Sequence, residues 1–454
     1  MTSRERAGSG DNAFSPRAQH VAPFVGQSET FNNERWSCLI SGTALGVPGE
    51  CILRTSRVLA IFAASLVALA PVHALAQDDA QDRVAVRDRS RPDYDPLGMR
   101  FGGFDLNATM DLSATSTDNL FAAETGEVDD IIYRVAPRAR LSSRWSRHSL
   151  AVAGGAELRS HGDFSSEDAE TAFLRADGRV DIGRASNVTI GAGWAHEVEP
   201  RTNPDASIFG APNEYDRTDV AVGASHQFNR FRVSATAGNT EYDYDAPQDF
   251  RDSTEDSLTG RVEAEVTPRI AAFVQARLDE REYDNQTPLS SEGRTYLAGL
   301  SLNITDLMRG DVGVGQFERD YDSGANVDGV AVAGNLEWYV TRLTTINLNA
   351  SRSAEDSGAF AASPYVASQY GARVDHELLR NLIVSAGGEF GARDYDVVDR
   401  QDDFRAAAVE AEYLMNRRVS LRGRFSHIDV DSNGVNRYRD FEVNEATIGL
   451  RLRL

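Results

Sequence analysis

The feature that most constrains this chain is a period-two alternation of apolar and polar residues, which recurs throughout the part beyond residue 100. In one stretch, the apolar residues Leu258, Val262 and Val266 stand at even-numbered positions, and the charged residues Arg261 and Glu263 stand at odd-numbered positions. Such alternation indicates β-strands with one apolar and one polar face. Eighteen of these segments can be counted, and they begin near residues 103, 130, 148, 169, 187, 217, 231, 256, 270, 293, 309, 328, 343, 363, 381, 403, 418 and 437.

The connections between these segments alternate strictly in length. Eight are short, such as 183–186 and 227–230, and nine are long, polar and acidic, such as 240–256. Short turns at one end and long loops at the other are typical of outer-membrane β-barrels. The number of strands is even, so the first strand begins and the last strand ends on the short-turn side, which fits the same class.

Two fold classes share this alternation. In a soluble sandwich the apolar face points inward, whereas in a membrane barrel it points to lipid and the polar face lines a lumen. The unit recurs about every 40 residues without a domain break, and residues 448–454 form a last apolar strand of the kind that barrel assembly machinery recognises. Closure also leaves no strand edge in lipid. An exported soluble β-protein is the alternative.

A secretory signal peptide is predicted at residues 53–76. Arg54 and Arg57 precede an apolar run at 58–72, and an Ala-Leu-Ala cleavage site ends at Ala76. This run is shorter than the roughly 20 residues that a membrane-spanning helix needs. The segment therefore predicts export from the cytoplasm, with the mature chain beginning near residue 77.

These features divide the chain into four parts. Residues 1–52 are interpreted as a doubtful N-terminal extension, either disordered or the product of a mis-assigned start, and residues 53–76 as the signal peptide. Residues 77–100 are expected to form a flexible periplasmic segment, and residues 101–454 the barrel. The predicted fold is all-β: a closed antiparallel, transmembrane up-and-down β-barrel of about 18 strands (16–18), with short periplasmic turns and long acidic extracellular loops.

Composition excludes several functions. The net charge of −22 argues against nucleic-acid binding, which needs a basic patch. Both cysteines, Cys38 and Cys51, precede the signal peptide, so the rest of the chain has no disulfide framework and no cysteine-ligated metal. The sequence also contains no H-E-x-x-H, no G-x-S-x-G and no phosphate-binding loop. We predict no enzymatic activity, no cofactor and no metal site.

Tyrosine-aspartate pairs recur at one kind of place. RDYD stands at 319–322 and at 393–396, and near copies surround Tyr242 and Tyr283, with spacings of 38 to 74 residues. We interpret the pairs as one level of the barrel, where a tyrosine ring lies at the lipid boundary and its hydroxyl reaches water. Each short turn carries an arginine, which either contacts phospholipid headgroups or is simply solvated.

The polar residues of the strands are expected to face the lumen. Opposite charges on neighbouring strands can pair and hold the wall in register, or they can create a field across the pore. Closure is expected to bring Arg451 and Arg453 beside Asp105. The candidate lumen-lining residues are Arg134, Arg138, Arg140, Glu157, Arg159, Arg175, Arg179, Arg261, Glu263, Glu265, Glu410, Glu412, Arg422, Arg424, Arg451 and Arg453.

The most distinctive sequence motifs lie in residues 91–148: RPDYDPLGMRFGGF at 91–104, DNLF at 118–121 and WSRH at 145–148. With these motifs the chain resembles the putative beta-barrel porin type 2 family of proteobacterial outer membranes, and the resemblance covers roughly residues 90–454. Some members of the family are associated with exopolysaccharide loci, so the resemblance implies passage of polysaccharide by analogy. It supplies no catalytic or ligand-binding residues.

Together these observations predict a porin-like protein of the cell outer membrane, which allows a polar solute or polysaccharide to pass and is linked by resemblance to exopolysaccharide export. The alternative is a structural or surface-interaction barrel with an occluded lumen. The expected partners are outer-membrane lipids, lipopolysaccharide and the barrel assembly machinery, with polysaccharide as a further candidate and no nucleic acid.

Overall fold

The computed structural model describes residues 84–454 apart from 204–205, 207–209, 286, 305–306 and 358–362. All of these residues belong to one of the two compact units of the chain, Arg35–Leu454. The signal peptide predicted at 53–76, the doubtful extension at 1–52 and residues 77–83 lie outside the described residues.

Regular structure in the described residues consists of nineteen strands and three 3-10 turns. The strands are β1 (Met99–Phe101), β2 (Phe104–Thr117), β3 (Asp130–Ser143), β4 (Ser149–His161), β5 (Ala169–Ile182), β6 (Ser186–Val198), β7 (Glu214–Phe228), β8 (Phe231–Tyr244), β9 (Ser253–Thr267), β10 (Ile270–Tyr283), β11 (Ser291–Ile304), β12 (Met308–Tyr321), β13 (Asn326–Thr341), β14 (Thr344–Asp356), β15 (Pro364–Leu379), β16 (Leu382–Tyr395), β17 (Gln401–Leu414), β18 (Val419–Asn433) and β19 (Phe441–Arg453). The turns are η1 (Ser165–Glu167), η2 (Asp249–Arg251) and η3 (Thr287–Leu289). No helix in this part of the chain is long and apolar enough to cross a membrane.

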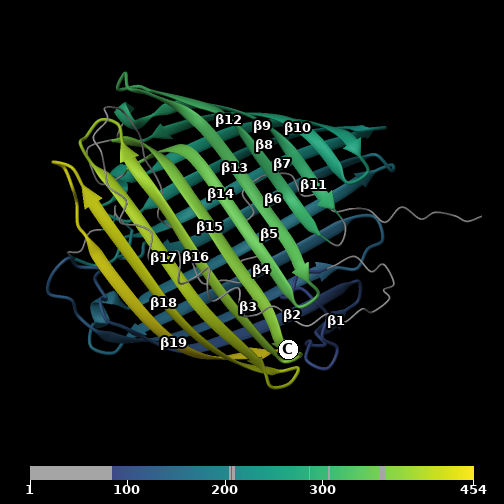
Figure 1. The fold of residues 1–454 in the computed structure, drawn as a ribbon, viewed down its shortest axis with the longest axis horizontal. Coiled ribbons are helices and arrows are strands. Elements are labelled where there is room, and N and C mark those ends of the chain that lie inside the picture. The colour runs from purple at the N-terminus through teal and green to yellow at the C-terminus, as the bar shows by residue number, and fades with distance from the viewer. Residues whose placement is uncertain (1–83, 204–205, 207–209, 286, 305–306, 358–362) are drawn as a thin grey trace, which may run out of the picture. The chain divides into compact units, whose positions relative to one another are not determined.

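Strands β2 to β19 close into an antiparallel barrel of eighteen strands. Each strand pairs with the next one along the chain, and β19 returns to pair with β2. The short extra strand β1 pairs with β2. Figure 1 shows β12 to β18 running side by side with a common tilt. The predicted closed antiparallel barrel of about 18 strands is confirmed.

The strand boundaries follow the sequence pattern closely. Every barrel strand begins within four residues of its predicted start, and the largest deviation is β19, which begins at Phe441 instead of near 437. The eight short connections lie at one end of the barrel, called here the short-turn rim. The other nine connections lie at the other end, the long-loop rim. Seven of them contain at least seven residues, but β12 and β13 are joined by only four (322–325) and β16 and β17 by only five (396–400), so the predicted strict alternation in length was wrong at these two places.

The alternation separates the two faces of the wall. On β9, Leu258, Val262 and Val266 are 52%, 42% and 63% exposed, whereas Arg261 and Glu263 are each only 8% exposed. The apolar side chains therefore point away from the barrel and the charged ones point into it, as a barrel in lipid requires.

Contacts between strands that are not neighbours confirm which face is the inner one. Arg261 Nη2 on β9 lies 3.1 Å from Asp311 Oδ2 on β12, although β10 and β11 run between these strands. Neighbouring strands lie about 4.8 Å apart, so two side chains can meet over three strand spacings only on the concave side of a curved wall.

Apolar packing on the inner face is confined to small clusters. One contains Phe317, Val327 and Val366, and a second contains Phe404 and Phe441. All five residues lie in the halves of their strands that adjoin the long-loop rim. The remaining described inner wall is lined mainly by polar or small side chains.

Candidate functional site

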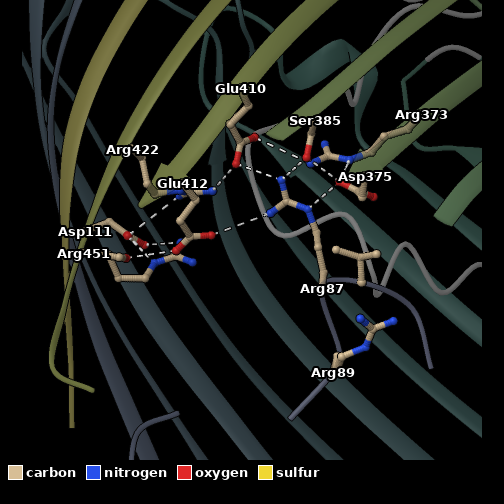
Figure 2. A network of polar contacts seen from close by, with 12 residues as sticks. Arg87, Arg89, Asp111, Arg373, Asp375, Ser385, Glu410, Glu412, Arg422 and Arg451 are labelled. Carbon is tan, nitrogen blue, oxygen red and sulfur yellow. Dashed lines mark hydrogen bonds and ion pairs between the residues drawn. The ribbon is translucent and has the colours of Figure 1, made fainter. Parts of the chain in front are cut away.

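The inner wall next to the short-turn rim carries a dense network of charged side chains (Figure 2). Strand register creates its centre, because Asp375 on β15 pairs with Ser385 on β16, and Ser385 pairs with Glu410 on β17. Glu412 lies two residues further along β17 and therefore shares the same face. These four residues, Asp375, Ser385, Glu410 and Glu412, are called the wall site.

A segment that precedes the barrel fills the wall site with a guanidinium. Arg87 Nε donates to Asp375 Oδ1 at 2.8 Å, and Arg87 Nη2 donates to Ser385 Oγ at 2.8 Å and to Glu410 Oε1 at 2.9 Å. Arg87 Nη1 lies 4.0 Å from Glu412 Oε2. Figure 2 shows the Arg87 side chain extending toward these groups from the segment below them. Such charge-assisted bonds are among the strongest polar contacts in proteins.

The carboxylates around Arg87 favour its charged form. Burial alone would lower the pKa of its guanidinium, yet the carboxylates of Glu410 and Asp375 outweigh burial and hold that pKa above its ordinary value. The contact therefore involves a permanent cation.

Further contacts hold the same segment against the wall. Arg89 Nη1 and Arg91 Nη2 lie 3.1 Å and 2.9 Å from Glu377 Oε2, and the Val86 amide donates to Thr345 Oγ1 at 3.0 Å. Residues 77–100 were expected to form a flexible periplasmic segment, and the structure places residues 85–92 against side chains of the wall. The alternating arginines at 87, 89 and 91 were the available signal.

The network continues across the seam where the barrel closes. Arg451 on β19 donates to Asp111 on β2 at 2.6 Å and 3.0 Å. Arg422 Nη2 lies 3.3 Å from Glu410 Oε1, and its Nη1 lies 4.0 Å from Asp111. Arg453 Nη2 lies 3.9 Å from Glu412.

The expectation that Arg451 and Arg453 lie beside Asp105 was wrong. The direct register partners are Asp111 for Arg451 and Thr109 for Arg453. The inward orientation of these residues was predicted correctly. A shift of one strand against its neighbour by an even number of residues leaves the same side chains facing inward, so alternation alone could not determine this register.

The other predicted lumen residues form further groups, and Arg138, which lies 4.0 Å from Asp111, links the group around Glu157 to the network. Glu157 on β4 contacts Arg134 at 2.6 Å, Arg138 at 3.7 Å and Arg159 at 3.1 Å. Arg175 contacts Asp177 and Asp219, Arg179 contacts Asp181, and Arg261 contacts Glu263 at 2.7 Å. Arg140 and Glu265 are exposed, and Arg424 on β18 is half-buried and pairs in register with Glu410.

Several network members were not among the predicted residues. They include Asp111, Asp375 and Glu377, each of which shares the parity of a predicted or charged residue on its own strand. The alternation indicates that they face inward, but it does not distinguish them from the other polar residues of the wall. Among the described residues, no group of three or more histidine, cysteine, aspartate or glutamate side chains could hold a metal ion.

The tyrosines of the repeated Tyr-Asp pairs face the lumen, so their assignment to the lipid boundary was wrong. Tyr321 and Tyr395 are each 5% exposed. Tyr321 Oη donates to Asp356 Oδ1 at 2.5 Å, and Arg281, which lies four strands from Asp356, also contacts this carboxylate. In RDYD the arginine and the tyrosine are two residues apart and share a face, which was the signal for an inward position.

The middle of the inner wall is lined by small residues. They share the parity of the buried charged residues on their strands, and they are Gly191, Gly193, Ala221, Gly223, Gly238, Gly313, Gly315, Ala331, Ala333, Gly371, Gly387, Ala406 and Ala408. A Cβ on Gly313 would lie 3.0 Å from the Phe273 ring, and one on Gly329 would lie 2.7 Å from the Phe317 ring. The glycines therefore let aromatic rings lie against the wall instead of projecting into the lumen.

The comparison with known families settles what kind of barrel this is. The family model described as Putative beta-barrel porin 2 matches residues 91–454. The chain belongs to this porin family. No curated protein matches the chain.

Solved structures from Pseudomonas aeruginosa are similar to this porin at low sequence identity. OpdK with vanillate has 13% identity and a TM-score of 0.43, and covers 77% of this chain and 99% of its own. OpdQ has 12% identity, a TM-score of 0.44 and coverages of 78% and 100%. OccK2 (OpdF) has 13% identity, a TM-score of 0.45 and coverages of 77% and 98%.

Proposed function

We propose that this porin is a passive channel of the bacterial outer membrane that lets polar solutes pass through its lumen. The observation that carries the proposal is a closed eighteen-strand barrel with apolar side chains outside and charged side chains inside. Barrels of 16–18 strands usually leave an aqueous channel. The small residues of the middle wall support an open lumen, because the wall there supplies little side-chain volume to fill it.

The outer face of the strands supports a location in a membrane. On β12, Val312 and Val314 point outward near the short-turn rim, whereas Glu318 and Asp320 point outward near the long-loop rim. The apolar band thus covers only the part of the strand next to the short turns. In our proposal that part crosses the outer membrane, the short turns face the periplasm, and the rest of each strand rises above the lipid toward lipopolysaccharide.

The nature of the solute is a finer proposal. We infer a polar solute, because charged side chains line the inner wall, and we assign the porin no enzymatic role. Polysaccharide is the solute that the family resemblance favours, with a role in exopolysaccharide export. Partial block of conductance by sugar polymers of graded length tests this point, since only polymers that enter the lumen reduce the current.

A second candidate function rests on the segment at residues 85–92, which lies on the inner wall. In this alternative the segment and the side chains around it occlude the lumen, and the barrel serves a structural or surface-interaction role. The segment reaches the wall strands β14 to β17 near the short-turn rim, so an occlusion would lie at that end.

One experiment separates the two candidates. The purified porin and a variant lacking residues 84–95 are inserted into planar lipid bilayers, and single-channel currents are recorded. A stable current from the unmodified protein supports the channel. Current from the deletion variant alone supports the occluded barrel, and silence from both proteins, with the folded form verified on gels, overturns the channel proposal.

A further inference from the structure

The wall site is built by the barrel itself. Asp375, Ser385 and Glu410 are direct register partners on three consecutive strands, so strand pairing sets their spacing whether or not Arg87 is present. Asp375 and Ser385 are among the most buried polar residues of the described wall, at 3% and 2% exposed. A polar site fixed on rigid strands is a more precise receptor than one carried by loops.

Neighbouring wall residues orient the acceptors of the site. Arg373 Nε donates to Asp375 Oδ1 at 3.0 Å, and Arg422 Nη2 donates to Glu410 Oε1 at 3.3 Å. Ser420 Oγ donates to Glu412 Oε1 at 2.9 Å. Each of the three carboxylates is thus held by a donor of the wall, which keeps its oxygens in place for a further ligand.

The arrangement of acceptors matches a guanidinium better than an ammonium. The site presents oxygens to separate nitrogens of Arg87: Asp375 to Nε, Ser385 and Glu410 to Nη2, and Glu412 to the side of Nη1. A planar guanidinium offers five donors in a fixed fan, whereas a lysine ammonium offers three donors from one point. One ammonium nitrogen cannot occupy all of these positions.

The resident guanidinium belongs to a segment that is held mainly by side chains. Residues 84–98 pair with no barrel strand, and the segment forms its first ladder only at Met99. The backbone of the segment meets the wall at the Val86 amide and at the Pro92 carbonyl, which accepts from Arg417 Nε at 2.9 Å. Contacts of this kind can be exchanged without opening the barrel.

We propose that the wall site is a guanidinium-binding site that takes free arginine-like solutes in competition with Arg87. The tether gives Arg87 an effective concentration on the order of millimolar or higher, so a free solute competes poorly while Arg87 is present. Removal of the Arg87 side chain turns the site into a receptor for solutes that enter the lumen. Binding of a guanidinium at the wall site does not depend on transport through the lumen.

Calorimetric titration of the full chain in detergent tests the proposal with free arginine as the probe. Arginine is expected to bind Arg87→Ala at least tenfold more tightly than the unmodified protein. The double variant Arg87→Ala/Glu410→Gln is expected to bind arginine at least tenfold more weakly than Arg87→Ala does. Citrulline, which has the shape of arginine without its charge, is expected not to bind, and lysine is expected to bind at least fivefold more weakly than arginine.

Arg405→Ala is the matched control. Arg405 lies on the same strand as Glu410 but on the outer face, where it pairs with Asp429 at 2.9 Å and with Asp431 at 3.3 Å. Its removal deletes an arginine with two carboxylate partners outside the lumen, so arginine binding should stay at the level of the unmodified protein. Equal gains in Arg405→Ala and Arg87→Ala would overturn the proposal.

A second measurement covers the case in which Arg87→Ala fails to fold. In a background with Cys38→Ser and Cys51→Ser, a spin label at Asp88→Cys reports on the segment next to Arg87. Arginine is expected to mobilise the label at concentrations at least fivefold below those needed for sodium chloride or lysine. Mobilisation by all three at the same ionic strength, or no binding of arginine to folded Arg87→Ala, would show that no guanidinium-specific site exists.

Discussion

Arg451 on β19 donates two hydrogen bonds to Asp111 on β2, and this pair joins the last strand of the barrel to the first. The bonds run from Nε to Oδ1 at 2.6 Å and from Nη2 to Oδ2 at 3.0 Å, and both residues are buried. Arg138 and Arg422 also approach Asp111 at 4.0 Å. One carboxylate at the seam thus faces three arginines.

Replacement of Asp111 by alanine is expected to lower the free energy of unfolding by about 3–5 kcal/mol, because it leaves the buried Arg451 without its carboxylate. The temperature at which the folded, fast-migrating band disappears from SDS gels measures the change. Asp105 lies on the same strand, and its contacts with Arg100 at 3.7 Å and Arg144 at 3.5 Å are solvent-exposed. Asp105→Ala should therefore change stability by less than about 1 kcal/mol. Equal losses in the two variants would contradict the register at the seam.

The inward tyrosines give a second prediction. Tyr321→Phe removes the donor to Asp356, and a hydrogen bond to a charged group contributes about 1.5–3 kcal/mol to stability. We expect a loss of that size in the unfolding free energy measured in urea. Tyr296 on β11 points outward and is exposed, so Tyr296→Phe should lie within about 0.5 kcal/mol of the unmodified protein. A larger loss of stability in Tyr296→Phe than in Tyr321→Phe would contradict the inward position of the tyrosines and favour their assignment to the lipid boundary.

The sequence predicted the elements of this barrel because each strand repeats the same two-residue period. The apolar parity of Leu258, Val262 and Val266 identified the outer face, and the same pattern located β2 and β10 within a residue of their starts. Register was not predictable in this way. Asp105 and Asp111 have the same parity, and the choice between them depends on strand stagger around the whole closed barrel.

The contacts of Arg87 with the wall site were less predictable than the inward orientation of the polar strand residues. The alternation of Arg87, Arg89 and Arg91 indicates a basic face but does not identify its partners, because the residues that Arg87 contacts on β15, β16 and β17 follow it in the chain by 288, 298 and 323 residues. Long-range ionic contacts of this kind depend on which inner-wall carboxylates become neighbours after closure. Alternation predicts that Glu410 faces inward, but it does not predict which cation lies beside it.

The glycines of the inner wall give a third prediction. A Cβ at Gly329 would lie 2.7 Å from the Phe317 ring, which packs in a buried cluster with Val327 and Val366. Gly329→Ala forces that ring to shift, and overpacking of this kind destabilises a protein by about 1–3 kcal/mol. Gly260→Ala is the control, because nothing lies within 4 Å of its Cβ position. The order of the two unfolding temperatures on SDS gels checks the prediction, and a lower temperature for Gly260→Ala would refute it.

The charge of the network gives the last prediction, which concerns ion selectivity. Two groups of ion pairs on the inner wall together contain ten arginines and six carboxylates. The larger group joins Arg87, Arg134, Arg138, Arg159, Arg373, Arg422, Arg451 and Arg453 with Asp111, Glu157, Asp375, Glu410 and Glu412, and the smaller group joins Arg89 and Arg91 with Glu377. An excess of positive charge on a pore wall raises the local concentration of anions. We therefore expect the open pore to prefer chloride over potassium.

The triple variant Arg87→Gln/Arg89→Gln/Arg91→Gln removes three of the ten arginines and leaves the barrel wall unchanged. The reversal potential in a potassium chloride gradient is expected to move toward cation preference, with at least a twofold fall in the chloride-to-potassium permeability ratio. Arg294→Gln, an exposed arginine that points outward on β11, should leave the ratio unchanged. The acidic loops at the other rim act in the opposite direction, so a cation-selective pore that the triple variant does not alter would show that the loops, and not this network, control permeation.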